Sequence, residues 1–329
     1  MSSKLIVVLG ATGNQGGSVI KSFIEDPAWR IRALTRSTSS SSAQALQRSG
    51  VEVMQANLDD PSSLEAAFQD ANAIFAVTDF WNSFANPENQ KKKRPDQPMN
   101  AWTYHYEKQQ GMNVFDAAAK VPTLEKLIFS SLSDASKWSK GKYTNVMHFD
   151  SKAHAAEYGK KTYPELWKKT SLLQVGWYLS NFLSHPLLQP RKNAEGVYQY
   201  ITGVRGDVHL PAMAAEEDTG PAAKALILSA PGKHLIAYRG WITLNEFFDI
   251  WSRVLGVPAK VVTLPDGESI PGVPEDLKQE LIDNWAYFND CGYEGRDDPS
   301  VIHPRQLEVP LSLPSVEEWI RQQDWSGVL

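Results

Sequence analysis

Short apolar runs alternate with amphipathic segments through the first half of the chain. Apolar or β-branched runs predict strands at residues 4–9, 31–35, 51–55, 73–77 and 127–130. Helical spacing of apolar side chains predicts helices at 17–25, at 42–48, after Asp60-Pro61 and at 104–120. Strands that alternate with helices form a parallel sheet covered on both faces. The pattern therefore predicts an α/β fold with a doubly wound sheet of the Rossmann type.

This alternation weakens after about residue 150. A helix expected at 151–161 precedes a strand at 170–175, and prolines then become frequent, with further helices expected at 243–255 and 275–289. We expect a Rossmann domain over residues 1–155, to which the strand near 170–175 returns. Residues 176–329 would then form a smaller α+β domain, with a cleft between the two.

Composition excludes several classes of protein. The 329 residues carry 33 Lys and Arg against 38 Asp and Glu, a net charge of −5, which argues against direct nucleic-acid binding through overall positive charge. The single cysteine, Cys291, excludes an intrachain disulfide and a zinc site made of several thiolates. His148, Asp150 and His154 do not share one helical face, so we expect no metal site.

Targeting signals are weak. No apolar run approaches the roughly 18 residues that span a bilayer, and the run 5–9 is too short for a signal peptide. We expect no membrane association and a cytoplasmic location. The basic run Lys91–Arg94, in a long loop between the fourth strand and the next helix, leaves nuclear entry, a partner patch or a mobile lid open.

The first strand leads directly into a glycine-rich turn. Gly10-Ala11-Thr12-Gly13-Asn14-Gln15-Gly16 lies between this strand and a helix, which is the setting of a dinucleotide fingerprint. Glycines let the backbone approach a pyrophosphate, and the helix N-terminus offers free N–H donors to it. We therefore predict a dinucleotide site at this turn.

The ends of the next strands indicate which dinucleotide is bound. Sites for NAD place an acidic residue after the second strand, whereas this chain has Arg36 followed by Ser37 in a serine-rich run. A guanidinium suits a 2′-phosphate, so NADP(H) is the predicted cofactor. Because ligands bind at the carboxyl ends of parallel strands, Asn57-Leu58 is expected beside the adenine and Val77-Thr78 near the ribose.

At this point the chain resembles the NmrA-like family, an atypical branch of the short-chain dehydrogenases, and its NADPH-sensing members in particular. The resemblance rests on residues 10–19, 77–81, 148–152, 181–185 and 218–221. It implies that Gly10, Thr12, Gly13, Asn14, Gln15 and Gly16 hold the pyrophosphate and that Arg36 reads the 2′-phosphate. It also implies that Lys152 reaches the nicotinamide ribose and that Tyr178–Asn181 close over the nicotinamide.

The catalytic motif departs from the usual one. Short-chain dehydrogenases use Tyr-x-x-x-Lys, but the equivalent residues here are His148 and Lys152. Three interpretations stay open: cofactor binding alone, proton donation by His148 or Lys152, and an ordinary packed histidine beside a surface lysine. The sensor branch favours a redox-responsive regulator of transcription that binds NADPH or NADP+ and acts through a protein partner. The alternative is an NADPH-dependent reductase of a small carbonyl, imine or enone substrate.

Overall fold

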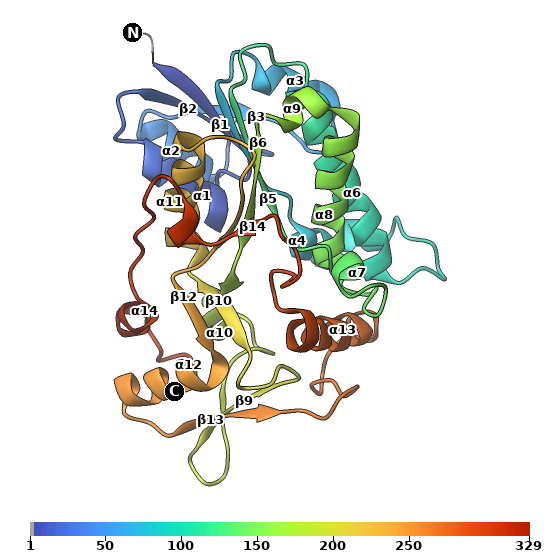
Figure 1. Cartoon of the computed structure of the whole chain (residues 1–329), viewed down its shortest axis with the longest axis vertical. Coiled ribbons are helices and arrows are strands. Elements are labelled where there is room, and N and C mark those ends of the chain that lie inside the picture. Colours follow the sequence, from blue (N-terminus) through green and yellow to red (C-terminus); the bar gives the residue numbers. More distant parts are fainter. Residues whose placement is uncertain (1–2) are drawn as a thin grey trace.

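The computed structural model describes residues 3–329 and is built around one parallel sheet of eight strands (Figure 1). Their order across the sheet is β14-β11-β6-β5-β4-β1-β2-β3. The strands are β1 (Lys4–Val8), β2 (Trp29–Thr35), β3 (Glu52–Gln55), β4 (Ala73–Ala76), β5 (Lys126–Ser131), β6 (Thr170–Val175), β11 (His234–Ala237) and β14 (Val301–Ile302). The doubly wound sheet and the return strand at 170–175 are confirmed. The order in which strands are added to the sheet reverses between β1 and β4, and such a switch point is where parallel sheets bind ligands.

Helices cover both faces of this sheet. Side chains of β1 alternate, so that Ile6 and Val8 join one apolar cluster with α1 (Asn14–Phe23) and α11 (Ala215–Leu228). Leu5 and Val7 join a second cluster on the opposite face. The helices of this second face are α3 (Pro61–Phe68), α6 (Met99–Ala118), α8 (Met147–Thr162) and α9 (Pro164–Trp167). None of the helices within residues 3–329 combines the length and apolar character needed to cross a membrane.

Two small three-stranded sheets lie beyond the carboxyl ends of the central strands (Figure 1). One contains β7 (Trp177–Tyr178), β10 (His209–Met213) and β12 (Gly240–Thr243), and the other contains β8 (Arg191–Lys192), β9 (Tyr198–Thr202) and β13 (Ala259–Thr263). The helices of this part are α10 (Asn181–Ser184), α12 (Leu244–Leu255), α13 (Glu275–Cys291) and α14 (Val316–Gln322), with a 3₁₀ turn at Pro304–Gln306.

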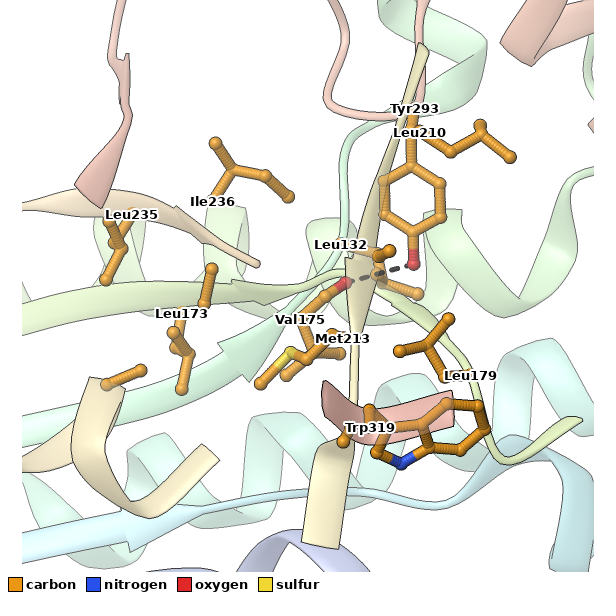
Figure 2. Packing of buried hydrophobic residues seen from close by; sticks show 14 of the residues in the cluster. Leu132, Leu173, Val175, Leu179, Leu210, Met213, Leu235, Ile236, Tyr293 and Trp319 are labelled. Carbon is orange, nitrogen blue, oxygen red and sulfur yellow. Dashed lines mark hydrogen bonds between the residues drawn. The ribbon is translucent and has the colours of Figure 1, made fainter. Parts of the chain in front are cut away.

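The small sheets and the central sheet share one apolar core. Figure 2 shows Leu173 of β6 and Leu235 of β11 in the same cluster as Met213 of β10 and Trp319 of α14. The Tyr293 hydroxyl donates a 3.0 Å hydrogen bond to the Val175 carbonyl within this cluster. Residues 176–329, predicted as the smaller domain, therefore also supply α11, β11 and β14 to the Rossmann unit.

Two predicted helix boundaries are wrong for the same reason. The helix expected at 104–120 is α6, which begins at Met99, and the helix expected at 151–161 is α8, which begins at Met147. Neither has a side-chain cap of its own. Instead, Asp276 of α13 accepts a 3.0 Å hydrogen bond from the Met99 N–H, and Glu280 accepts one from the His148 N–H. Caps supplied by a distant helix leave no local sequence signal.

The connection after β4, predicted as a long loop, is partly helical. It contains α4 (Phe80–Ala85) and α5 (Pro87–Gln90). The Asp79 carboxylate caps α4 by accepting from the Asn82 N–H, and Asn86 caps α5. Similarly, α2 (Ser41–Arg48) starts from a Ser40 cap, and α7 (Ala135–Trp138) follows Asp134. The basic run Lys91–Arg94 therefore comes directly after a short helix.

Close packing of α11 on α1 gives a stability prediction. A Cβ atom on Gly220 would lie 2.1 Å from the Ser18 carbonyl oxygen, so Gly220→Ala forces the two helices apart. We expect urea denaturation to show a loss of about 1–3 kcal/mol in the free energy of unfolding. Gly17→Ala on α1 is the control, because its Cβ meets nothing closer than 3.7 Å. Equal effects of the two substitutions would contradict the packing argument.

Candidate active site

The glycine turn leaves the N-terminus of α1 open. Gly10 has a φ of 61°, and Gly13 precedes the helix without any side-chain cap. A Cβ atom on Gly16 would lie 2.3 Å from the Gly10 carbonyl oxygen, so only glycine lets the turn close this tightly. Thr12 and Asn14 are exposed beside it. Uncapped N–H groups and a bare backbone form the cradle that a pyrophosphate requires.

A hydrogen bond connects this turn to the small sheets. The Tyr178 hydroxyl of β7 accepts a 2.7 Å hydrogen bond from Gln15 Nε2, while Gln15 Oε1 is buried without a partner among the described residues. Burial raises the pKa of Tyr178, so the phenol stays protonated. Asn181 begins α10 three residues later, and its carbonyl accepts from the His185 N–H. The segment predicted to close over the nicotinamide thus lies against the glycine turn.

Arg36 lies exposed just beyond the end of β2, near Tyr106, a residue that the sequence analysis did not predict. The Tyr106 hydroxyl of α6 donates a short hydrogen bond to Asp59. Burial and this carboxylate raise the pKa of Tyr106, whereas the positive charge of Arg36 opposes the rise. Ser37 follows with its N–H 3.3 Å from Thr35 Oγ1. Within residues 3–329 the Arg36 guanidinium has no hydrogen-bond or ion-pair partner, and it lies at the edge predicted to meet the 2′-phosphate.

The ends of β3 and β4 are fixed by contacts from neighbouring segments. The Asn57 N–H donates to Ser63 Oγ at 3.0 Å, and the Leu58 carbonyl accepts from Asn113 at 2.8 Å. Val77 lies against Gly10, where a Cβ atom would come within 2.7 Å of its Cγ1. Asp60 caps α3 by accepting from the Ser62 and Ser63 N–H groups. These ends all border the sheet edge that carries the glycine turn.

Lys152 is held in a buried ion pair. It lies on α8 and is only 9% exposed. Its ammonium contacts Glu107 of α6 and donates to the carbonyl and hydroxyl oxygens of Thr78, at 3.1 and 3.0 Å. Glu107 is 1% exposed and also accepts from the Ser151 hydroxyl. Three acceptors match the three protons of the ammonium, so Lys152 joins the end of β4 to both helices.

His148 lies one helical turn before Lys152 and has a different acidic partner. Its Nδ1 is 2.7 Å from Glu280 Oε1 of α13, and the His148 N–H donates to the same oxygen at 3.0 Å. This geometry assigns the ring proton to Nδ1. His148 Nε2 has no hydrogen-bond partner within residues 3–329. The exposed indole of Trp81 lies beside the ring, with centroids 4.9 Å apart.

The structure brings most of the predicted residues to one edge and, besides Tyr106, adds two carboxylates that were missed, Glu107 and Glu280. The sequence only weakly indicates Glu107, as an acidic residue in a helix that also carries many apolar residues. It does not indicate Glu280, because Glu280 lies 132 residues from His148 in the chain. Two tryptophans pack nearby: Trp102 stacks on Tyr106, and Trp177 packs edge-on against Phe182.

Asp150 and His154 turn to another side of α8. Asp150 accepts from Ser136, and His154 Nδ1 lies 2.7 Å from the Tyr104 hydroxyl. The Asp134 carboxylate, 3.6 Å from His154 Nε2, raises the pKa of His154. Among the residues that the structure describes, no group of three or more His, Cys, Asp or Glu is arranged to hold a metal ion.

Comparison with known proteins places this arrangement in context. The chain is 26% identical over 321 residues to the NmrA-like family domain-containing oxidoreductase cpsB of Aspergillus campestris, an alignment that covers 94% of this chain and 90% of the relative. A crystal structure of NmrA, a negative transcriptional regulator, superposes with a TM-score of 0.77 at 21% identity, covering 98% of this chain and 95% of NmrA. NmrA has also been solved in complex with NAD and with NADP.

A triphenylmethane reductase of Citrobacter sp., solved with NADP(H), superposes with a TM-score of 0.67 at 19% identity and covers 97% of this chain and 99% of the reductase. At these identities the structural likenesses show a shared fold, which a regulator and a reductase both use. The sequence model of the NmrA-like family matches residues 2–320, and this chain therefore belongs to the NmrA-like family.

Proposed function

We propose that this protein binds NADP(H) at the glycine turn and is an NADPH-dependent reductase of a small carbonyl, imine or enone compound. The catalytic part of this proposal rests on His148, which lies one helical turn from Lys152. Its Nδ1 is hydrogen-bonded to a buried carboxylate, and its Nε2 has no partner among the described residues. A protein that only binds cofactor does not need a histidine hydrogen-bonded to a buried carboxylate at the position of the usual proton donor.

Cofactor binding is supported by the fit of the residues present. The uncapped start of α1 and the glycine cradle suit a pyrophosphate, and the free guanidinium of Arg36 suits a 2′-phosphate. Gln15, with its unpartnered carbonyl oxygen, and Tyr178 stand where the nicotinamide end is expected. The NADP(H) complexes of the regulator and the reductase of the same fold agree with this assignment.

Lys152 and His148 have different proposed roles because their contacts differ. Deprotonating Lys152 would leave the Glu107 carboxylate buried without a cation, which is costly. Lys152 therefore serves as a fixed positive charge that holds the end of β4. His148 delivers the proton to the substrate heteroatom, and bound NADPH supplies the hydride.

Regulation through a protein partner is the competing function, and one experiment separates the two. We would follow NADPH absorbance with a panel of carbonyl, imine and enone compounds. Consumption of NADPH with any of them supports the reductase. If none is consumed while NADPH changes binding to a partner, the regulatory function takes its place.

Arg36 gives a prediction about cofactor preference. Arg36→Ala removes the guanidinium, so affinity for NADPH should fall by about tenfold or more, or roughly 1.4 kcal/mol, while affinity for NADH changes little. Tryptophan fluorescence titration measures both. Arg30→Ala, an exposed arginine near the other end of β2, is the matched control and should leave both affinities unchanged. Equal losses for NADPH and NADH would remove the phosphate-reading role.

His148 gives a prediction about turnover. His148→Gln removes the proton donor, so kcat should fall by about 100-fold or more, with the Kd for NADPH within about twofold. The control is His154→Gln on the same helix, because His154 faces Tyr104 instead. An unchanged kcat in His148→Gln would show that another group donates the proton to the substrate.

Lys152 and Glu107 give a prediction about stability. Lys152→Met leaves Glu107 buried without its cation and should lower the free energy of unfolding by about 3–5 kcal/mol. Adding Glu107→Gln should recover part of this loss, because the remaining side chain is neutral. Urea denaturation of the single and double variants measures the coupling. Strictly additive losses would show that the pair is not coupled.

A further inference from the structure

One face of α13 carries a stripe of polar side chains, spaced four and three residues apart, that all contact the Rossmann unit. The stripe consists of Asp276, Glu280, Asp283, Tyr287 and Asp290. Their partners, in the same order, are the Met99 N–H, His148, Asn145, the Ser133 hydroxyl, and Lys142 with Tyr143. This spacing keeps all five on one side of the helix. The stripe therefore docks α13 against the starts of α6 and α8.

Glu280 differs from the other carboxylates of the stripe. Its side chain is completely buried, and one oxygen accepts from both the backbone N–H and Nδ1 of His148. Its second oxygen, Oε2, is buried with no partner among the described residues. The other acids reach backbone, amide, lysine or tyrosine groups that take no part in the proposed chemistry. Burying a carboxylate against a single histidine ring carries a desolvation free energy, and helix docking alone does not require that cost.

We propose that Glu280 is a positioning residue for proton transfer, and that α13 thereby completes the active site from the far end of the chain. This inference rests on the proposed reductase function. Glu280 keeps the Nδ1 proton in place, so that Nε2 is the nitrogen that exchanges its proton with substrate. The carboxylate also stabilises the imidazolium form that donates the proton.

The step balances for a carbonyl substrate. Bound NADPH would supply the hydride, with its electron pair, that reduces the carbonyl carbon, and NADP+ would be the oxidised product. The Nε2–H bond of His148 breaks as the O–H bond of the alcohol forms. His148 is left as a neutral ring that keeps its Nδ1 proton, hydrogen-bonded to Glu280, and a proton from water then restores the Nε2–H bond. For an imine, the nitrogen receives the same proton.

The other groups around His148 do not replace Glu280. From α4 the ring meets Phe80 and Trp81, which are uncharged, and the Asp79 carboxylate that caps α4 is engaged by Asn82. On its own helix, Lys152 is neutralised by Glu107 of α6. On α13, Asp276 and Asp283 bind Met99 and Asn145. Glu280 is the charged side chain in contact with the ring.

The test compares Glu280→Gln with Asp283→Asn, a matched loss of one carboxylate from the same stripe. Glutamine can still accept from Nδ1 but places no charge beside the ring. In Glu280→Gln, kcat should be lower by about tenfold or more. The Kd for NADPH should stay within about twofold. Asp283→Asn should keep the wild-type kcat. Equal kcat values in the two variants would show that Glu280 is only a docking contact.

A second readout does not depend on turnover. Nitrogen-15 NMR of histidine-labelled protein reports which ring nitrogen carries the proton, and His148→Gln identifies the signals of His148. We expect the neutral ring of the wild type to be protonated at Nδ1, with a mixed tautomer in Glu280→Ala. An unchanged tautomer in Glu280→Ala overturns the inference. The expected tautomer change in a protein that consumes no NADPH would uphold the Glu280 contact and reject the reductase function instead.

Discussion

The docking of α13 on the Rossmann unit is the constraint on which the candidate active site depends. A helix start leaves backbone N–H groups without partners, and neither α6 nor α8 has a side-chain cap of its own. Acidic side chains of α13 take that role through Asp276 and Glu280. Removing α13 would therefore expose two helix starts and leave His148 without its carboxylate. In the proposed reductase, helix capping and the positioning of His148 depend on the same contacts.

The two acid–base pairs of α8 differ in how fully their basic groups are engaged, and in the proposed reductase one supplies a fixed charge and the other a proton. Lys152 has all three ammonium protons engaged by Glu107 and Thr78, which ties the end of β4 to α6 and α8. His148 has one ring nitrogen engaged by Glu280 and one without a partner in the described chain. In the usual short-chain dehydrogenase motif the lysine supports a tyrosine. Here a buried carboxylate supports the residue at the tyrosine position.

Much of the cofactor half of the site was predictable because its signals are local. A strand, a glycine turn and a helix lie consecutively in residues 4–23, and Arg36 directly follows the next strand. Such signals depend on backbone freedom and on charge at a strand end, which are properties of a few neighbouring residues. The catalytic half was predictable only as far as the pair His148 and Lys152. The partners of that pair come from α6 and α13, and their sequences do not mark them as partners.

The sequence by itself determined the parallel sheet, the glycine turn, the arginine at the 2′-phosphate edge and the missing tyrosine, because periodicity and spacing along the chain encode them. Tertiary structure alone decided the starts of α6 and α8, the return of β11 and β14 to the central sheet, and the pairing of His148 with Glu280. These features depend on contacts between residues far apart in the chain. A buried carboxylate in a helix signals that some partner exists, but only the folded chain selects which one.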